Sequence, residues 1–135
     1  MKWKAILIIF CLVIIPISLF SQEGEVVESE LKVTKAAICR GVSEREPVES
    51  DTVFSSDIER VFCFTKIEGA DTPTTIFHVW KYGDKEMASV ELDVRSPSWR
   101  TWSSKRIISS WTGQWSVDIR NAEGETLKTL EFEIK

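Results

Sequence analysis

The sequence predicts an all-β domain, folded as an antiparallel two-sheet sandwich of about seven strands with immunoglobulin-like architecture. Short apolar runs recur at intervals of about ten residues, and turn-forming residues separate them. No stretch keeps the period of an amphipathic helix for long enough to predict one. The 135 residues have room for one domain, and their 43% hydrophobic and 10% aromatic content supports a packed core.

The start of the chain has the layout of a secretory signal peptide. Two lysines precede an almost wholly apolar run from Ala5 to Phe20, and the chain turns polar at Ser21, after which we expect cleavage. The alternative is an uncleaved membrane anchor, although the run is short for a span and Pro16 interrupts it. We expect a periplasmic or secreted protein, attached to a membrane only if this leader is retained. The expected organisation is a signal peptide at 1–21, a flexible acidic lead-in at 22–30 and a β-sandwich domain at 31–135.

Two strands are expected in the first half of the domain, at Leu31–Arg40 and Val61–Ile67. The polar passage 41–57 lies between them, and its Pro47 disfavours a helix and forbids a central strand. Alternation along the second strand divides its side chains between two faces. One face carries Cys63, Thr65 and Ile67, and the other carries Phe62 and Phe64.

The next two strands are expected at Thr75–Tyr82 and Met87–Val94, joined by a Gly-Asp-Lys turn. On the first, Phe77 and Val79 share one face, while Ile76, His78, Trp80 and Tyr82 share the other. Either face can meet the core, so the burial of Trp80 stays open. On the second strand, the inward side chains are Ala88, Val90, Leu92 and Val94.

The last two strands alternate clearly. Gly113–Arg120 directs Trp115 and its alternate neighbours to the core, and a hairpin loop follows, in which Gly124 can take a positive φ. The inward positions of the two strands are Trp115, Val117 and Ile119, then Leu130, Phe132 and Ile134.

Cys39 and Cys63 are the cysteines outside the leader, and in an exported domain they are expected to form a disulfide. Closing that loop would stabilise the fold by roughly 3 kcal/mol on the chain-entropy model. The alternative is a pair of buried free thiols.

Four of the six tryptophans lie between Ser96 and Trp115, interleaved with basic residues. Exposed rings beside cationic groups suit sugar faces with hydroxyls or carboxylates, and they also suit protein interfaces. We expect Trp99 and Trp111 to be the exposed rings, because Pro97 and Gly113 place them near turns. The candidate ligand-binding residues are Trp99, Arg100, Lys105, Arg106 and Trp111. The alternative is that the rings pack beneath the loop and that the Glu44–Glu46 segment pairs with Arg100 or Arg106.

Other kinds of chemistry find little support in the residues. The mildly acidic chain, with net charge −4 and no basic run, argues against nucleic-acid binding. The one histidine, His78, is expected to be a hydrogen-bonded strand residue. Ser103 and Lys105 have no recognisable oxyanion hole beside them, so we expect neither catalysis nor a cofactor or metal.

Several motifs together resemble the bacterial family called domain of unknown function 2914, from about Thr34 to about Leu130. The resemblance implies an extracytoplasmic bacterial β-domain and assigns no reaction or ligand. With the aromatic segment, it leads us to expect a non-catalytic module that binds an envelope glycan, or alternatively a protein-interaction or assembly module that binds an envelope protein. The motifs are Cys39-Arg-Gly-Val-Ser-Glu-Arg-Glu-Pro47, Cys63-Phe-Thr-Lys66, His78-Val-Trp80, Trp99-Arg-Thr-Trp-Ser-Ser-Lys105 and Trp111-Thr-Gly-Gln-Trp115.

Overall fold

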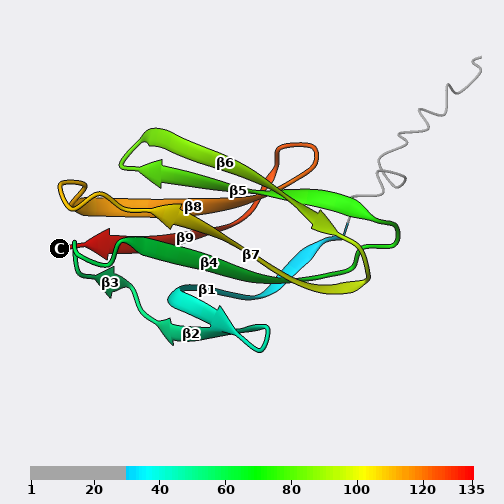
Figure 1. Cartoon of the computed structure of the whole chain (residues 1–135). Helices are drawn as coiled ribbons and strands as arrows, with labels where there is room; N and C mark the ends of the chain where they lie inside the picture. The colour runs from blue at the N-terminus through cyan, green and yellow to red at the C-terminus, as the bar shows by residue number, and fades with distance from the viewer. Residues whose placement is uncertain (1–29) are drawn as a thin grey trace, which may run out of the picture.

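The computed structural model describes residues 30–135. The expected signal peptide and nearly all of the acidic lead-in therefore lie outside the described residues. Within residues 30–135 the chain forms nine strands and two sheets, which confirms the all-β sandwich (Figure 1). The strands are β1 (Lys32–Ser43), β2 (Glu46–Ser50), β3 (Val53–Phe54), β4 (Arg60–Glu68), β5 (Thr74–Tyr82), β6 (Lys85–Val94), β7 (Ser98–Arg106), β8 (Gly113–Asn121) and β9 (Thr126–Ile134).

The four-stranded sheet has the order β2-β1-β4-β7, and the five-stranded sheet has the order β3-β9-β8-β5-β6. All neighbouring strands pair antiparallel except β3, which runs parallel to β9. In this arrangement β2 and β7 are the edges of the four-stranded sheet. The aromatic segment of the sequence therefore includes an edge strand.

The structure has nine strands rather than about seven, and two of those without a predicted counterpart, β2 and β3, lie in the polar passage 41–57. Strand β2 folds back on β1 through Glu44 and Arg45, which have φ of 51° and 61°. Tight hairpins of this kind favour Gly, Asn or Asp at such positions, so these two residues give no sequence cue for the turn. Pro47 lies on the edge strand β2, where the lack of an N–H donor is tolerated.

The core between the sheets contains the side chains that alternation predicted. One cluster centres on Trp80, Trp115 and Phe132, and a second contains Ile67, Ile76 and Ile119. The ring centroids of Trp80 and Phe132 lie 6.2 Å apart in an edge-on arrangement. The Trp80 face of β5 is thus the buried one, which settles the open choice between its two faces.

A polar network crosses the core beside these rings. Nε2 of His78 lies 3.2 Å from Oγ1 of Thr65, and Nδ1 of His78 lies 2.6 Å from Oγ of Ser103. The indole N–H of Trp80 also donates to Oγ of Ser103, at 3.1 Å. Burial lowers the pKa of His78 to about 4, so the ring is neutral at pH 7. His78 is therefore the hydrogen-bonded strand histidine that the sequence led us to expect.

The expected disulfide is not formed in this structure: Cys39 and Cys63 are both free, buried thiols. The strand register gives the physical reason, since Cys63 lies opposite Ile38, whereas Cys39 lies opposite Phe62. Successive residues of a strand point to opposite faces, so the two sulfur atoms lie on opposite sides of the sheet. Burial raises the pKa of both thiols.

Candidate functional site

The outer face of the four-stranded sheet, directed away from the five-stranded sheet, carries a band of aromatic and basic side chains. Alternation along β7 places Arg100, Trp102, Ser104 and Arg106 on this face, because the intervening Ser103 points into the core. Their register partners on β4 present the same face. Those partners are Lys66, Phe64, Phe62 and Arg60.

Trp102 is the exposed ring of this outer face. Its centroid lies 6.5 Å from that of Phe64, with the two rings 16° from parallel. Phe64 is fully buried although it points away from the core, whereas Trp102 stays 38% exposed. Nζ of Lys35 lies 5.9 Å from the Phe64 centroid. The indole of Trp102 therefore lies nearly parallel to the buried ring of Phe64 and is partly open to solvent.

At one end of the outer face, acidic partners neutralise the cations. Glu46 on β2 forms ion pairs with Lys35 at 2.6 Å and with Arg100 at 3.2 Å. The hydrogen bond from Lys35 is the main reason that the pKa of Glu46 lies below its usual value. Nζ of Lys66 lies 3.7 Å from Oε1 of Glu68. The pairing of Arg100 with the Glu44–Glu46 segment, which the sequence analysis left open, is therefore formed.

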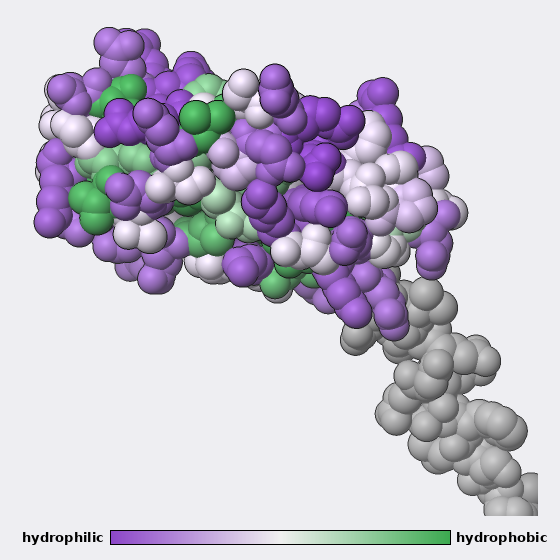
Figure 2. All heavy atoms as spheres, turned by 90° about the horizontal axis from the view of Figure 1, so that it is seen from below, coloured by the Kyte–Doolittle hydropathy of each residue, from purple (hydrophilic) through white to green (hydrophobic). Residues whose placement is uncertain are grey.

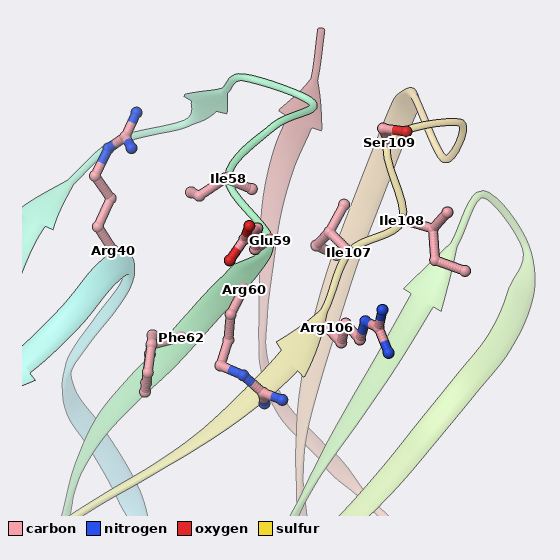
Figure 3. A pocket seen from close by; sticks show the side chains of 9 residues that line it. All are labelled: Arg40, Ile58, Glu59, Arg60, Phe62, Arg106, Ile107, Ile108 and Ser109. Carbon is pink, nitrogen blue, oxygen red and sulfur yellow. The ribbon is translucent and has the colours of Figure 1, made fainter.

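At the other end, three arginines line an open hollow with a volume of about 730 Å³. Arg60 and Arg106 leave the adjacent ends of β4 and β7, and Arg40 comes from β1 on the far side (Figure 3). The walls of the hollow also include the apolar side chains Ile58, Phe62, Ile107 and Ile108 together with Glu59 and Ser109. We call this site the arginine hollow. It joins the outer face through Arg60, Phe62 and Arg106.

The arginines of the hollow differ in their contacts. Arg60 lies directly opposite Arg106 in the register, and its Nη1 donates to Oγ of Ser104 at 2.6 Å. Neither of these two guanidinium groups forms an ion pair with an acidic side chain of residues 30–135. Arg40 makes a long ionic contact, 3.8 Å from Nε to Oε2 of Glu49, and its Cζ lies 6.0 Å from the ring centroid of Phe54. The hollow is therefore a positively charged site with apolar walls.

Four of the five predicted site residues lie on β7, divided between its two sides, and Trp111 lies in the loop that follows. Arg100 and Arg106 lie on the outer face, but Trp99 and Lys105 have the opposite strand parity. Trp99 packs half-buried against the second core cluster. Lys105 lies over the ring of Trp111, with Nζ 5.2 Å from its centroid.

The expected exposure of Trp99 and Trp111 is therefore wrong, and Trp102 is the exposed ring. Trp111 is half-buried because its ring packs 5.9 Å from that of Trp115. Sequence reasoning missed Trp102 and Arg60 as site residues. Counting alternate positions from Arg100 finds Trp102 and Arg106, but Arg60 joins them only through the pairing of β4 with β7.

Ser103 and Lys105, which were considered as a catalytic pair, point to different surroundings. Ser103 is 6% exposed and bonded to the fully buried His78, so a substrate does not reach either group. Within residues 30–135, no group of three or more His, Cys, Asp or Glu side chains is placed to hold a metal ion. The same part of the chain contains no helix long and apolar enough to cross a membrane.

Hydrophobic side chains reach the surface elsewhere as well. Figure 2 shows the side of the domain that faces down in Figure 1, where hydrophilic atoms predominate and hydrophobic atoms appear in several separate areas. The large hydrophobic residues that are exposed in the described domain are Val48, Val53, Trp102 and Ile108. Trp102 is the aromatic member of this group.

Fold and surface together define a β-sandwich domain with a basic, aromatic face on its smaller sheet. Residues 73–134 match the model of the family described as "Protein of unknown function (DUF2914)", which confirms the resemblance for the segment from β5 to β9. No curated protein matches the chain. Among solved structures, the chain is similar to a mutant β-glucosidase from Listeria innocua in complex with laminaribiose, with 10% identity and a TM-score of 0.44. That match covers 78% of this chain and 16% of the β-glucosidase chain, and no functional argument rests on it.

Proposed function

We propose that this protein is an exported, non-catalytic binding module that recognises an envelope glycan through the outer face of its four-stranded sheet. The observation that carries the proposal is the indole of Trp102, which lies nearly parallel to the buried ring of Phe64 and is partly open to solvent. A sugar ring presents an apolar face that packs on such an indole, and neighbouring arginines donate hydrogen bonds to its oxygens. Export rests on the leader-like sequence at 1–21.

The dimensions of the outer face fit an extended ligand. Trp102 and Arg106 are four residues apart on one strand, which corresponds to about 13 Å at the usual rise per residue. A ligand that contacts both must be longer than one sugar ring. The outer face therefore suits an oligosaccharide that runs along β7.

Calorimetric titration tests this function. The purified protein is titrated with soluble peptidoglycan fragments and a panel of oligosaccharides, beside Trp102→Ala and the control Trp111→Phe. We expect Trp102→Ala to weaken the binding of a responding glycan by about tenfold or more, which corresponds to the energy of one stacked ring, and the control to bind like wild type. Equal affinity of all three proteins, or no response to any glycan, would contradict the proposal.

The second candidate is a protein-interaction or assembly module of the envelope, and the edge strands favour it. Within the described domain, β7 ends one sheet and β6 ends the other. An edge strand offers unpaired backbone groups to a strand of a partner protein. Proline in place of an edge residue would weaken such pairing, whereas Trp102→Ala would leave most of it intact. This contrast distinguishes the two functions.

A further inference from the structure

We infer that the arginine hollow is an oxyanion subsite, in which Arg60 and Arg106 bind a carboxylate or phosphate group carried on a sugar. This inference rests on the proposed function and adds the chemical class of the ligand: an acidic glycan. It assigns a role to Arg60, which the sequence did not single out, and it gives Arg106 a role different from that of Arg100.

Arg60 and Arg106 have no acidic side chain of residues 30–135 as an ion-pair partner. They lie directly opposite each other on antiparallel strands and on one face. Like charges in this position repel and destabilise a sheet unless a counter-charge lies between them. The acidic partners that neutralise Lys35, Lys66 and Arg100 are on the other half of the outer face.

The two guanidinium groups also have free hydrogen-bond donors. A guanidinium group carries five N–H donors in a planar fork that matches the oxygens of a carboxylate or phosphate. Arg60 uses Nη1 for the bond to Ser104 and has the rest of its fork available. No hydrogen bond joins the guanidinium of Arg106 to another side chain of the described domain. Both side chains line the same hollow, so their free N–H groups are available to an oxyanion bound there.

A backbone hydrogen bond holds the rim of the hollow. The carbonyl of Glu59 accepts the N–H of Ile107 at 2.8 Å, which ties the start of β4 to the end of β7. Glu59 has a φ of 65°, in the left-handed region that non-glycine residues seldom adopt and that recurs at binding sites. This hydrogen bond fixes the two strand ends that carry Arg60 and Arg106.

The walls indicate what carries the anion. Phe62 is half-buried on one side of the hollow, and Ile108 is exposed on the other. A volume of about 730 Å³ lies in the range of small-molecule sites. A free inorganic ion would leave these apolar side chains exposed to water, whereas a sugar ring bearing the acid group would cover them. The hollow therefore favours an acid group on a ring over a free anion.

A matched pair of ligands tests the inference. Tetragalacturonate and its fully methyl-esterified form have the same rings and differ in their carboxylates, and inorganic phosphate serves as the free anion. Calorimetry is run on wild type, Arg60→Gln, Arg106→Gln and the control Arg120→Gln, whose arginine pairs with Asp118 on the five-stranded sheet. We expect wild type to bind the acid at least tenfold more tightly than the ester. Each hollow variant should lose most of that difference while the control keeps it.

The outcomes separate this inference from the proposed function. If acid and ester bind equally to wild type, or if the hollow variants keep the difference, the oxyanion subsite is wrong although glycan binding stands. If neither glycan binds, the proposed function fails. In that case phosphate decides the oxyanion site: it stands if phosphate raises the melting temperature of wild type and not of Arg106→Gln. Without that rise, the inference fails as well. The ligand-free variants provide a second readout: Arg106→Gln should melt at the same temperature as wild type or higher, because it removes a like-charge pair. A lower melting temperature would mean that Arg106 is structural.

Discussion

The Oγ atom of Ser103 on β7 lies 2.6 Å from Nδ1 of His78 on β5, so a hydrogen bond joins the two sheets through the core. Together with Thr65 on β4, Ser103 satisfies both ring nitrogens of a histidine that has no access to water. The same contact fixes the orientation of β7. With Ser103 held inward, Trp102 and Ser104 must face outward, and the outer face of the four-stranded sheet follows from this one inward serine.

Ser103→Ala should reduce the free energy of unfolding by about 2–4 kcal/mol, because it leaves a nitrogen of His78 and the indole N–H of Trp80 without partners in the core. The matched control is Ser104→Ala on the outer face, where we expect a loss below about 1 kcal/mol. Urea unfolding followed by tryptophan fluorescence measures both. Equal losses for the two serines would contradict the inward placement of Ser103.

His78 should make the protein less stable in mild acid. Its pKa is about 4 in the folded protein, below the ordinary value of 6.5, so the unfolded chain takes up the proton first as the pH falls. The stabilisation from the neutral ring is complete above pH 6.5 and is lost toward pH 4, by about 3 kcal/mol in total. Urea midpoints measured across this interval should fall steeply for wild type. His78→Gln should be less stable at pH 7 and show a flatter profile, and an unchanged slope would contradict the assignment.

Cys39 and Cys63 should both be free thiols in the purified protein. Burial and raised pKa values make them poor nucleophiles, so iodoacetamide should modify the folded protein slowly. In denaturant without reductant, both should react within the time needed to alkylate a model thiol. Intact mass reports the number of groups added. If modification requires prior reduction, the two cysteines form the disulfide that the sequence predicted, and the prediction of free thiols is wrong.

Gly69→Ala should destabilise the fold by about 2 kcal/mol or more. Gly69 has a φ of 96°, and a Cβ atom there would lie 2.3 Å from the backbone oxygen of Glu30. Both the conformation and the contact disfavour a side chain. Gly41→Ala is the control, since nothing lies within 4 Å of its Cβ position. Thermal unfolding of the two variants should separate them clearly, and similar melting temperatures would show that the turn at Gly69 relaxes freely.

Alternation predicted much of the core, and it failed where the environment of a side chain depends on a distant strand. Trp115, Val117 and Ile119 are buried as predicted, because each strand repeats the same two-residue period. The packing of Trp102 against Phe64 depends on the pairing of β4 with β7, because the two residues become neighbours only through it. The hairpin turn at residues 44 and 45 could not be predicted, because neither residue is of a type that favours positive φ. The disulfide prediction ignored register, which places the sulfurs on opposite faces.

Part of the candidate site could be predicted from the sequence. The enrichment of tryptophan and basic residues between Ser96 and Trp115 pointed to the right segment, and Arg106 remains in the site. The segment includes β7, the loop after it and the start of β8, however, so its side chains separate onto different surfaces. Arg60 and Arg40 join the site from two other strands, and local sequence carries no information about that proximity.

The most direct test of the account is an NMR titration of the isotope-labelled protein with tetragalacturonate and with soluble peptidoglycan fragments. If the outer face of the four-stranded sheet is the binding surface, the indole N–H of Trp102 and the amides of β4 and β7 should shift first and saturate together, while β8 and β9 stay fixed. Shifts confined to the five-stranded sheet, or spectra that no glycan perturbs, would contradict it.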